Sequence, residues 1–296
     1  MKLLVTGASG FIGSRLVNAA CAALGAENVI AFSSKPVHAY PSIVYQGSDF
    51  NLSEADNALL STVEVLIHAG AFIPKDGLQA NAIEECNGNI RFTEKLLALP
   101  LGNLKKIIYV STADVYQPAE LTTEETPTLP VSLYGWSKLY CERMTSIFAA
   151  DHRIDCQILR IGHVYGPGEE KYAKFLPRAI KNIVGSEAVE LWGDGSEVRS
   201  FIYIDDVVAA ILQAVNLCAD IGPINVVGGV PVSIRALLDQ LILVSGKPVE
   251  VTTRESRETK RNYIFNNAKL RQHLLPTETD LSAGLQAEYA YMAGLT

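Results

Sequence analysis

Short apolar runs recur along the chain at the length of buried strands, and segments with helical spacing separate them. Six runs are typical of strands, namely KLLV, NVIAFSS, SIVYQGSDF, VEVLIHAGA, LKKIIYVST and IDCQILRIG. Between and after them, apolar positions recur every three or four residues, which predicts helices over 80–98, 133–149, 175–184, 205–217 and 233–244. Strands that alternate with helices in this way predict an α/β fold with a doubly wound parallel sheet.

The pattern changes after the segment VYGPG, where glycine and proline interrupt the alternation. We therefore expect a Rossmann-type domain over residues 1–165 and a smaller α/β domain over 166–296. A segment near 200–227 is expected to return to the first domain. A length of 296 residues suits two domains, or one large α/β domain.

The carboxyl ends of the predicted strands define where a ligand is expected. In open parallel sheets, ligands bind in the crevice beyond these ends. The residues that fall there are Gly7, Ser33, Asp49, His68, Thr112 and Gly162.

The stretch LVTGASGFIG places Gly7, Gly10 and Gly13 between the first strand and the first helix. It is either an ordinary strand-to-helix turn or a surface for a phosphate. Unpaired N–H groups and the dipole at a helix start favour an anion. Gly7 supplies a tight turn, Gly10 removes a side chain from the path of a pyrophosphate, and Gly13 lets the helix pack closely. The flanking strand and helix favour the phosphate interpretation.

Composition narrows the class of protein. The apolar fraction of 48% supports a large core, and a net charge of −7 without a basic stripe argues against nucleic-acid binding. The five cysteines are scattered and form no C-x-x-C pair, so we expect free thiols and no metal site. The apolar run at the start is too short for a signal peptide or a membrane span, which leads us to expect a cytoplasmic protein without a membrane partner.

The stretch YGWSK contains Tyr134 and Lys138, which share one face of a predicted helix. A tyrosine has an ordinary pKa near 10. An ammonium group close by favours the phenolate and lowers that pKa, so Tyr134 could act as a base near neutral pH. The Y-x-x-x-K spacing alone is a weak signal, but here it follows a strand that ends in STADVY.

Taken together, T-G-x-x-G-x-x-G, STADVY and YGWSK resemble the extended short-chain dehydrogenase/reductase family, in particular its nucleotide-sugar epimerases and dehydratases. Five further segments carry the resemblance through most of the chain: VLIHAGA, NGNIRFTEKLL, LRIGHVYGPG, LWGDGSEVRSFIYIDDV and GPINVVGGVPVSIRALL. The chain past Lys247 matches poorly.

The resemblance implies a catalytic set of Thr112, Tyr134 and Lys138. It also implies cofactor contacts, in addition to Tyr134 and Lys138, from Gly7, Gly10, Phe11, Ile12, Gly13, Ser33, Ser34, Lys35, Asp49, Phe50, His68, Ala69, Gly70, Ala71, Asn87 and Ile161. Substrate contacts are implied for Ala113, Asp114, His163 and Arg199, of which Arg199 would bind the diphosphate of a nucleotide sugar. A second diphosphate arginine, such as Arg254 or Arg257, cannot be assigned from the sequence.

Three positions depart from the family's pattern. The dehydratases have an acidic pair after the position of Thr112, whereas this chain has Ala113 and Asp114, and an alanine cannot protonate a leaving hydroxyl. Asp114 either faces the sugar or makes a turn contact. His163 stands where the family usually has Asn, and it either binds substrate or is structural. The second strand ends in AFSSKP without a carboxylate for the ribose 2′-OH, which favours NADP over NAD.

Three functions remain open on this evidence. The first is a nucleotide-sugar epimerase that transiently oxidises a hexose ring carbon, carbon 4 by resemblance. The second is an NADPH-dependent reductase of a 4-keto-6-deoxy sugar nucleotide, and the third is a non-catalytic NADP-binding sensor. The resemblance also implies a homodimer that pairs the helices predicted over 80–98 and 133–149.

Overall fold

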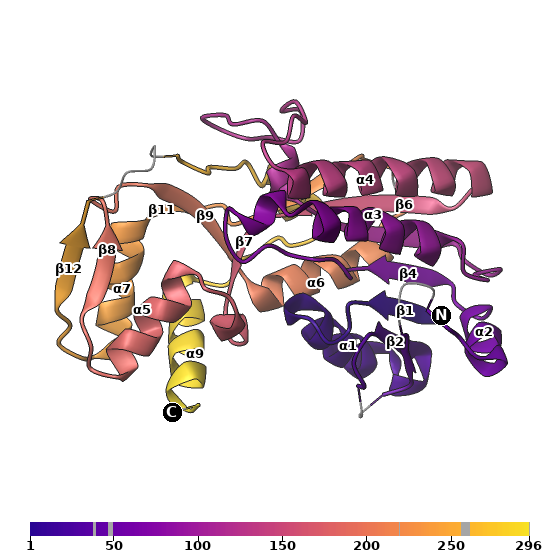
Figure 1. Ribbon diagram of the computed structural model, residues 1–296, viewed down its shortest axis with the longest axis horizontal. Helices are drawn as coiled ribbons and strands as arrows, with labels where there is room; N and C mark the ends of the chain where they lie inside the picture. The colour runs from indigo at the N-terminus through magenta and orange to yellow at the C-terminus, as the bar shows by residue number, and fades with distance from the viewer. Residues whose placement is uncertain (38–39, 47–49, 219, 256–260, 296) are drawn as a thin grey trace. The chain divides into compact units, whose positions relative to one another are not determined.

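The computed structural model describes residues 1–37, 40–46, 50–218, 220–255 and 261–295. Seven strands form one sheet in the order β10-β6-β5-β4-β1-β2-β3 (Figure 1). Their bounds are β1 Leu3–Thr6, β2 Val29–Ser33, β3 Ser42–Val44, β4 Val65–His68, β5 Lys106–Thr112, β6 Asp155–Ile161 and β10 Ile224–Val226. Every neighbouring pair from β6 to β3 is parallel. This confirms the predicted doubly wound α/β fold.

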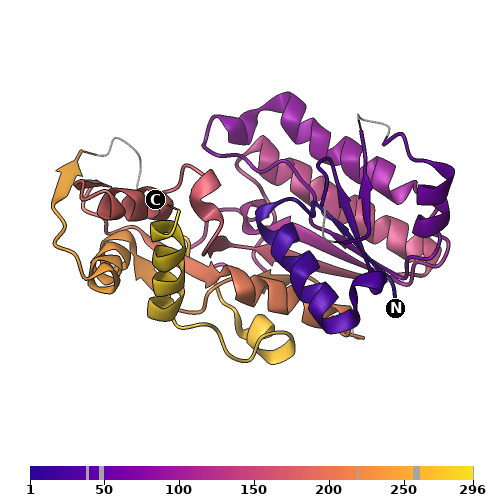
Figure 2. The ribbon, with the colours of Figure 1, turned by 90° about the horizontal axis from the view of Figure 1, so that it is seen from below.

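Helices cover both faces of this sheet. In Figures 1 and 2, α3 (Ile83–Leu97) and α4 (Leu133–His152) lie on one face, and α1 (Phe11–Leu24) and α6 (Ile204–Val215) lie on the other. The strands β1, β2, β4 and β5 are buried along their whole length, because helices cover them from both sides. The chain winds outward from β1 to β3 and then crosses to β4 on the other side of β1. This crossing is the topological switch point, where ligands bind in such sheets.

The predicted helices agree with the structure within a few residues. The helix expected over 133–149 extends to His152, and the one expected over 80–98 begins at Ile83. The start of α4 is fixed by Ser132, whose side chain accepts the Gly135 N–H at 3.1 Å. The third strand, expected to run to Asp49, ends at Val44, and Asp49 itself lies outside the described residues.

The chain divides into two compact units. Unit 1 comprises Met1–Gln117, Pro127–Ile161 and Val207–Ile224, and unit 2 comprises Pro118–Thr126, Gly162–Asp206 and Asn225–Thr296. The returning segment is thus shorter than the expected 200–227. Membership of Pro118–Thr126 in unit 2 was not predicted; there the Thr122 N–H donates to the Ile264 carbonyl and the Thr122 carbonyl accepts the Asn266 N–H.

Unit 2 contains two small sheets and a group of helices. One sheet has the order β11-β9-β7, from β11 (Pro231–Ser233), β9 (Val198–Tyr203) and β7 (His163–Tyr165). The other pairs β12 (Val251–Arg254) with β8 (Val189–Trp192) in parallel. The helices are α5 (Phe175–Val184), α7 (Ile234–Ser245), α8 (Ala268–His273) and α9 (Leu281–Ala293), and α5, α7 and α9 pack against one another.

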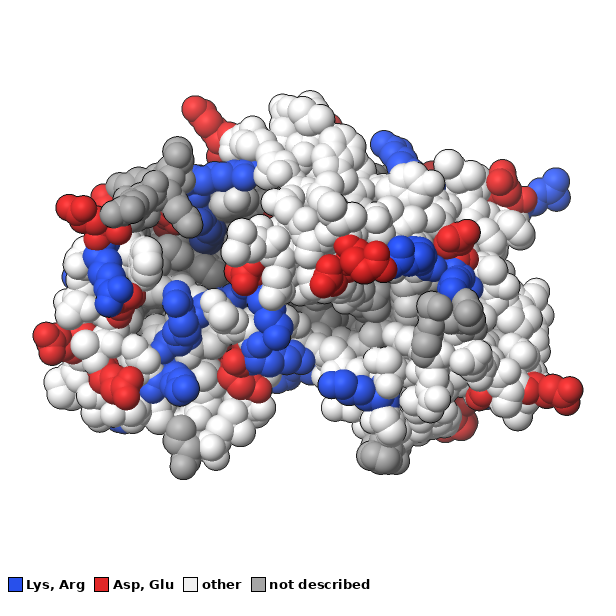
Figure 3. Space-filling model, in the orientation of Figure 1, with Lys and Arg blue, Asp and Glu red and all other residues white. Residues whose placement is uncertain are grey.

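The charged side chains on the face drawn in Figure 3 agree with the expectation of a surface without a basic stripe. On the face drawn in Figure 3, Lys and Arg side chains lie intermixed with Asp and Glu. Among the described residues, no helix has the length and apolar character needed to cross a bilayer. All five cysteines are free thiols.

Candidate active site

The glycine turn of unit 1 forms a close-packed cradle at the start of α1. Gly7 has φ of 68°, and the Gly10 N–H donates to the Gly7 carbonyl at 2.8 Å. A Cβ on Gly13 would lie 2.0 Å from the Gly7 oxygen, and a Cβ on Gly7 would lie 2.7 Å from the Gly70 Cα. Gly10 is the N-cap of α1, where no side chain caps the first turn. The backbone N–H groups there suit a pyrophosphate, so these residues fit a dinucleotide cofactor.

A buried hydrogen-bond chain holds the end of β4 against this cradle. The Thr6 hydroxyl accepts the Gly70 N–H at 2.9 Å and bonds to His68 Nδ1 at 3.0 Å. His68 Nε2 bonds to the Thr93 hydroxyl at 2.9 Å, and that hydroxyl can donate to the Asn89 carbonyl at 2.9 Å. Because the Thr93 hydroxyl donates to Asn89, it accepts a hydrogen bond from His68, so these bonds place the His68 ring proton on Nε2. Burial and the Lys138 ammonium hold the pKa of His68 well below its ordinary value, so the ring is neutral.

The His68 ring therefore uses both nitrogens inside the protein. It positions the backbone of Ala69, Gly70 and Ala71, which are only partly buried and follow β4 at the switch point. The cofactor contact predicted for His68 can thus come from its neighbours in this segment. His68 itself is 1% exposed, and the cofactor contact expected for it stays a prediction.

The end of β2 carries hydroxyl groups and an exposed lysine. The Ser33 hydroxyl is buried and donates to the Ser9 hydroxyl at 2.8 Å, and the Lys35 N–H donates to Ser33 at 3.2 Å. Ser34 and Lys35 are exposed. Ser9 comes from the glycine turn, so the turn and the end of β2 form one polar edge. Ser9 was not predicted as a cofactor residue, because its pairing with Ser33 spans 24 residues.

The remaining predicted cofactor residues differ in how much of each side chain is buried. Phe11 is buried at the start of α1, Ile12 is partly buried beside it, and Ile161 is buried at the end of β6. The Phe50 ring lies in the core against Phe32, at a centroid distance of 5.2 Å, so only its backbone is available to a ligand.

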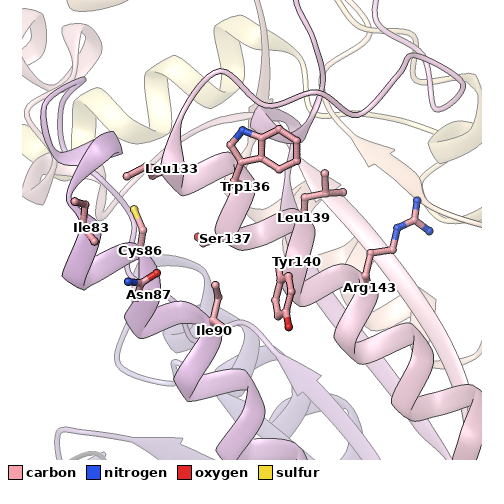
Figure 4. A pocket seen from close by; sticks show the side chains of 10 residues that line it. All are labelled: Ile83, Cys86, Asn87, Ile90, Leu133, Trp136, Ser137, Leu139, Tyr140 and Arg143. Atoms are coloured by element: carbon pink, nitrogen blue, oxygen red, sulfur yellow. The ribbon is translucent and has the colours of Figure 1, made fainter.

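Asn87 lies apart from the other predicted cofactor residues. It is exposed and lines a groove on the outer side of α3 and α4 (Figure 4). Asn89 takes the inward position instead, where its amide oxygen accepts the Phe72 N–H at 2.7 Å and its nitrogen donates to the Ser137 hydroxyl at 3.3 Å. Its spacing of four residues from the buried Thr93 is a signal that could have identified it.

The three predicted catalytic residues are all buried within unit 1, with exposed fractions of 8% for Thr112, 6% for Tyr134 and 3% for Lys138. Lys138 Nζ donates to the Val110 carbonyl at 2.8 Å and lies 4.4 Å from the centre of the Tyr109 ring. Burial lowers the pKa of Lys138 to about 8. The lysine is therefore mostly protonated at neutral pH, and its charge favours the phenolate of a tyrosine on the same helix face.

A short 3-10 turn, η3 (Ala113–Val115), follows directly on Thr112. The Thr112 hydroxyl accepts the Asp114 N–H at 3.2 Å, which leaves the hydroxyl proton available to another acceptor. The first turn of α4 packs on η3, since a Cβ on Gly135 would lie 2.5 Å from the Asp114 carbonyl oxygen. Of the two substrate contacts predicted on η3, Ala113 is partly buried, and Asp114 bonds to Thr112 through its backbone N–H. The sugar contact of the Asp114 side chain stays a prediction.

Unit 2 contains a cluster of two arginines and three aromatic rings. The Arg199 guanidinium lies 4.6 Å from the centre of the Tyr263 ring, donates to the Arg261 carbonyl and pairs with Glu197 at 2.9 Å. The Arg261 guanidinium lies 4.5 Å from the same ring. The other members are His163, whose ring is 5.3 Å from Tyr263, and Phe201.

The structure describes one of the two arginines that the sequence left open as a second diphosphate ligand, and that arginine does not belong to this cluster. Arg254 pairs with Glu190 on the strands β12 and β8, and Arg257 lies outside the described residues. Arg261 was missed because its approach to Arg199 spans 62 residues of sequence. Within the cluster, burial and the charges of Arg199 and Lys174 lower the pKa of His163 to about 3, so the ring is neutral, and its Nδ1 is buried without a hydrogen-bond partner.

The fold and this geometry agree with comparisons to known proteins. A family model described as "NAD dependent epimerase/dehydratase family" matches residues 3–228. UDP-glucose 4-epimerase of Mycolicibacterium smegmatis is 29% identical over 267 residues, which are 84% of each chain. dTDP-glucose 4,6-dehydratase of Streptomyces griseus is 28% identical over 315 residues, which are 98% of this chain and 93% of that one.

Solved structures give the same assignment. UDP-glucuronic acid 4-epimerase from Bacillus cereus, in complex with UDP-glucuronic acid and NAD, superposes with a TM-score of 0.85 at 28% identity and 100% coverage of both chains. The chain therefore belongs to the NAD-dependent epimerase/dehydratase family. This confirms the resemblance noted from the sequence and the expectation of an enzyme of the epimerase and oxidoreductase type.

Proposed function

We propose that the protein is a nucleotide-sugar epimerase that inverts a hexose ring carbon, carbon 4, of a nucleoside-diphosphate sugar. The observation that carries the proposal is the set of Thr112, Tyr134 and Lys138 buried in the same unit as the glycine cradle. Relatives and similar structures that act on UDP-sugars support the substrate class. Ala113 disfavours the dehydratase alternative, because it offers no proton to a leaving hydroxyl.

In this mechanism the side chains of unit 1 handle protons while the cofactor, when bound, accepts and returns a hydride. The phenolate of Tyr134 takes the proton of the ring hydroxyl and later returns it. The Lys138 ammonium, held by the Val110 carbonyl, is a positive charge on the same helix face, and a charge of this kind favours a phenolate. The Thr112 hydroxyl donates a hydrogen bond to the same sugar oxygen.

In this proposal unit 1 binds the cofactor and unit 2 binds the nucleotide sugar. Unit 1 holds the dinucleotide through Gly7, Gly10 and Gly13 and through the segment that ends β4. Unit 2 holds the nucleotide sugar through its arginine cluster, with His163 as a neutral hydrogen-bonding group. These roles correspond to the cofactor and substrate domains expected over 1–165 and 166–296. We also retain the expected cytoplasmic location, with the five free thiols as support.

An assay without added reductant tests the main proposal. An epimerase returns its hydride in each cycle, so purified protein incubated with UDP-, GDP- and dTDP-hexoses should form an epimer while cofactor is not consumed. The reductase alternative is favoured by the Ser33–Lys35 edge, which suits an exchangeable NADPH. Stoichiometric NADPH consumption with a 4-keto-6-deoxy sugar nucleotide, and no epimer from any hexose, would establish the reductase. Tight NADP binding without either reaction would establish the sensor.

We further propose NADP as the preferred cofactor and predict that Lys35→Asp shifts the preference toward NAD. Ser9 of the glycine turn and Ser33 and Ser34 at the end of β2 supply hydroxyls, and Lys35 supplies a charge for a 2′-phosphate. A carboxylate there would repel the phosphate and accept the ribose hydroxyl bond. Dissociation constants for both cofactors in both proteins measure the shift. Lys181→Asp, on the exposed side of α5, is the matched charge control. Wild-type protein that already prefers NAD would contradict the proposal.

For the arginine cluster we predict that Arg199→Ala and Arg261→Ala each weaken nucleotide-sugar binding but not cofactor binding. A charge-assisted hydrogen bond to a phosphate contributes about 1.5–3 kcal/mol. Calorimetry with a turned-over sugar nucleotide measures the loss. Arg235→Ala, whose partner is Asp239 on the surface of α7, is the control. Equal affinities in wild type and both variants would remove the cluster from substrate binding.

We also propose that the protein is a homodimer through the outer side of α3 and α4. This side bears a groove of about 610 Å³, and several large side chains that line it are exposed: Ile83, Leu133, Trp136 and Tyr140 (Figure 4). Such a cluster is typical of an interface. Sedimentation velocity should give a dimer for wild type and a monomer for Trp136→Glu, whereas a wild-type monomer at all concentrations would contradict the proposal.

A further inference from the structure

One face of α4 carries three buried polar side chains in series, of which the predicted mechanism uses only two. Tyr134, Lys138 and Glu142 are spaced four residues apart and have exposed fractions of 6%, 3% and 3%. A buried carboxylate is costly unless it is paired and hydrogen-bonded. The partner of Glu142 therefore decides what this third side chain does.

That partner is Arg160 on β6, which binds Glu142 with two parallel hydrogen bonds. Arg160 Nε donates to one carboxylate oxygen at 3.0 Å, and a terminal nitrogen donates to the other at 2.8 Å. Both side chains are nearly completely buried, with exposed fractions of 5% and 4%. A bidentate contact of this kind fixes both the distance between the two side chains and their relative orientation. It joins the middle of α4 to the sheet.

The remaining terminal nitrogen of Arg160 contacts Tyr116, which follows the segment that carries Thr112. This nitrogen donates to the Tyr116 hydroxyl at 2.9 Å, and the guanidinium of Arg160 lies 4.8 Å from the centre of the Tyr116 ring. Tyr116 directly follows η3, and its N–H donates to the Ala113 carbonyl at 3.2 Å. The turn between Thr112 and Tyr116 is thus held at both ends, by β5 and by Arg160.

One guanidinium on β6 therefore connects the two elements that carry the catalytic set. Strand β6 carries Arg160, helix α4 carries Tyr134 and Lys138, and the segment from β5 into η3 carries Thr112. The second link between α4 and η3 is the packing of Gly135 on the Asp114 carbonyl, which leaves no room for a Cβ. All of these residues belong to unit 1.

We propose that Arg160, with Glu142 and Tyr116, is a positioning residue that sets the placement of the Thr112 hydroxyl relative to Tyr134 and Lys138. This role rests on the proposed epimerase function. The three residues touch neither substrate nor cofactor in this proposal, and they act through the elements that they hold together. Displacements of about 1 Å in a catalytic set are enough to slow a reaction substantially.

The ion pair of Glu142 and Arg160 also affects the pKa of Lys138. The Glu142 carboxylate raises the pKa of Lys138 against the lowering effect of burial. The titratable groups that act on Lys138 or lie against it come from three elements: His68 on β4, Tyr109 on β5, and Cys141 and Glu142 on α4. Removing the charge of Glu142 while Arg160 stays would add net positive charge beside Lys138 and lower the pKa of Lys138.

The decisive variant is Tyr116→Phe, which keeps the ring and the ion pair and removes only the hydroxyl that holds Arg160. We expect kcat for epimerisation to fall about 10- to 100-fold, with the KM for the sugar nucleotide and the Kd for the cofactor nearly unchanged. Tyr291→Phe, at an exposed position on α9, is the matched control and should keep the wild-type kcat. Thermal unfolding of both variants shows whether they fold.

The second variant, Glu142→Gln, gives a readout that a purely structural role would not move. The alkaline limb of its pH–kcat profile should shift to lower pH, while Tyr116→Phe should keep the wild-type profile. Folded Tyr116→Phe protein with a wild-type kcat, or a Glu142→Gln profile that matches wild type, would overturn the proposal. Absence of epimerisation in the wild type would instead count against the proposed function. If Glu142→Gln does not fold, Tyr116→Phe decides the question.

Discussion

Tyr134→Phe should reduce turnover by roughly 10²–10⁴-fold while cofactor affinity stays close to that of the wild type. The substitution removes one oxygen atom from a buried ring and leaves the shape of the side chain unchanged. Without that oxygen, neither the removal nor the return of the ring-hydroxyl proton has a group to perform it. Lys138 cannot replace it, because its Nζ is bound to the Val110 carbonyl at 2.8 Å and it is mostly protonated at neutral pH.

The measurement is kcat for epimerisation together with a cofactor titration of the same preparation. Retained cofactor binding shows that the fold of unit 1 is intact, so a loss of kcat then reports on the proton transfer alone. Tyr291→Phe again serves as the exposed control. A Tyr134→Phe protein that turns over near the wild-type rate would exclude Tyr134 as the acid–base group.

Gly13→Ala should weaken cofactor binding about ten- to a hundredfold, even though Ala is the better helix former. The added Cβ would lie 2.0 Å from the Gly7 carbonyl oxygen, whereas an ordinary contact begins near 3.4 Å. The turn has to move away from α1, and the Gly7 side of the cradle is already closed by Gly70. The loss corresponds to one charge-assisted hydrogen bond, about 1.5–3 kcal/mol. Overpacking of the turn should also destabilise the fold by roughly 1–3 kcal/mol.

Gly88→Ala is the matched control, because it adds the same methyl group to another helix. Gly88 lies within α3, and a Cβ there would meet no atom within 4 Å. This variant should gain about 1 kcal/mol of stability from helix propensity and keep its cofactor affinity. Fluorescence titration with NAD and NADP and thermal unfolding measure both effects. Equal cofactor affinities in Gly13→Ala and Gly88→Ala would mean that the cradle does not bind the dinucleotide.

The sequence predicted the features of this protein that depend on short-range repeats. Buried strands and helix faces follow from the spacing of apolar residues, so the parallel sheet and most helix bounds agree with the structure. The glycine turn and the Tyr134–Lys138 pair are local as well, since each lies within a few residues of one element. The order of the strands, and with it the position of the switch point, was not predicted from the sequence and comes from the structure.

Tertiary structure decided which polar residues face one another, because those contacts join residues far apart in the chain. Thr6 and His68 are 62 residues apart, and the hydrogen bond between them holds the His68 ring in the core. Arg199 and Arg261 are also 62 residues apart, and Arg160 lies 44 residues from Tyr116. Asn89 takes the inward position on α3 that the sequence suggested for Asn87, because the rotation of a helix is fixed by what packs on it. The sequence alone determined the scaffold and the chemistry it carries; the register and rotation of packed elements determined which side chains support that chemistry.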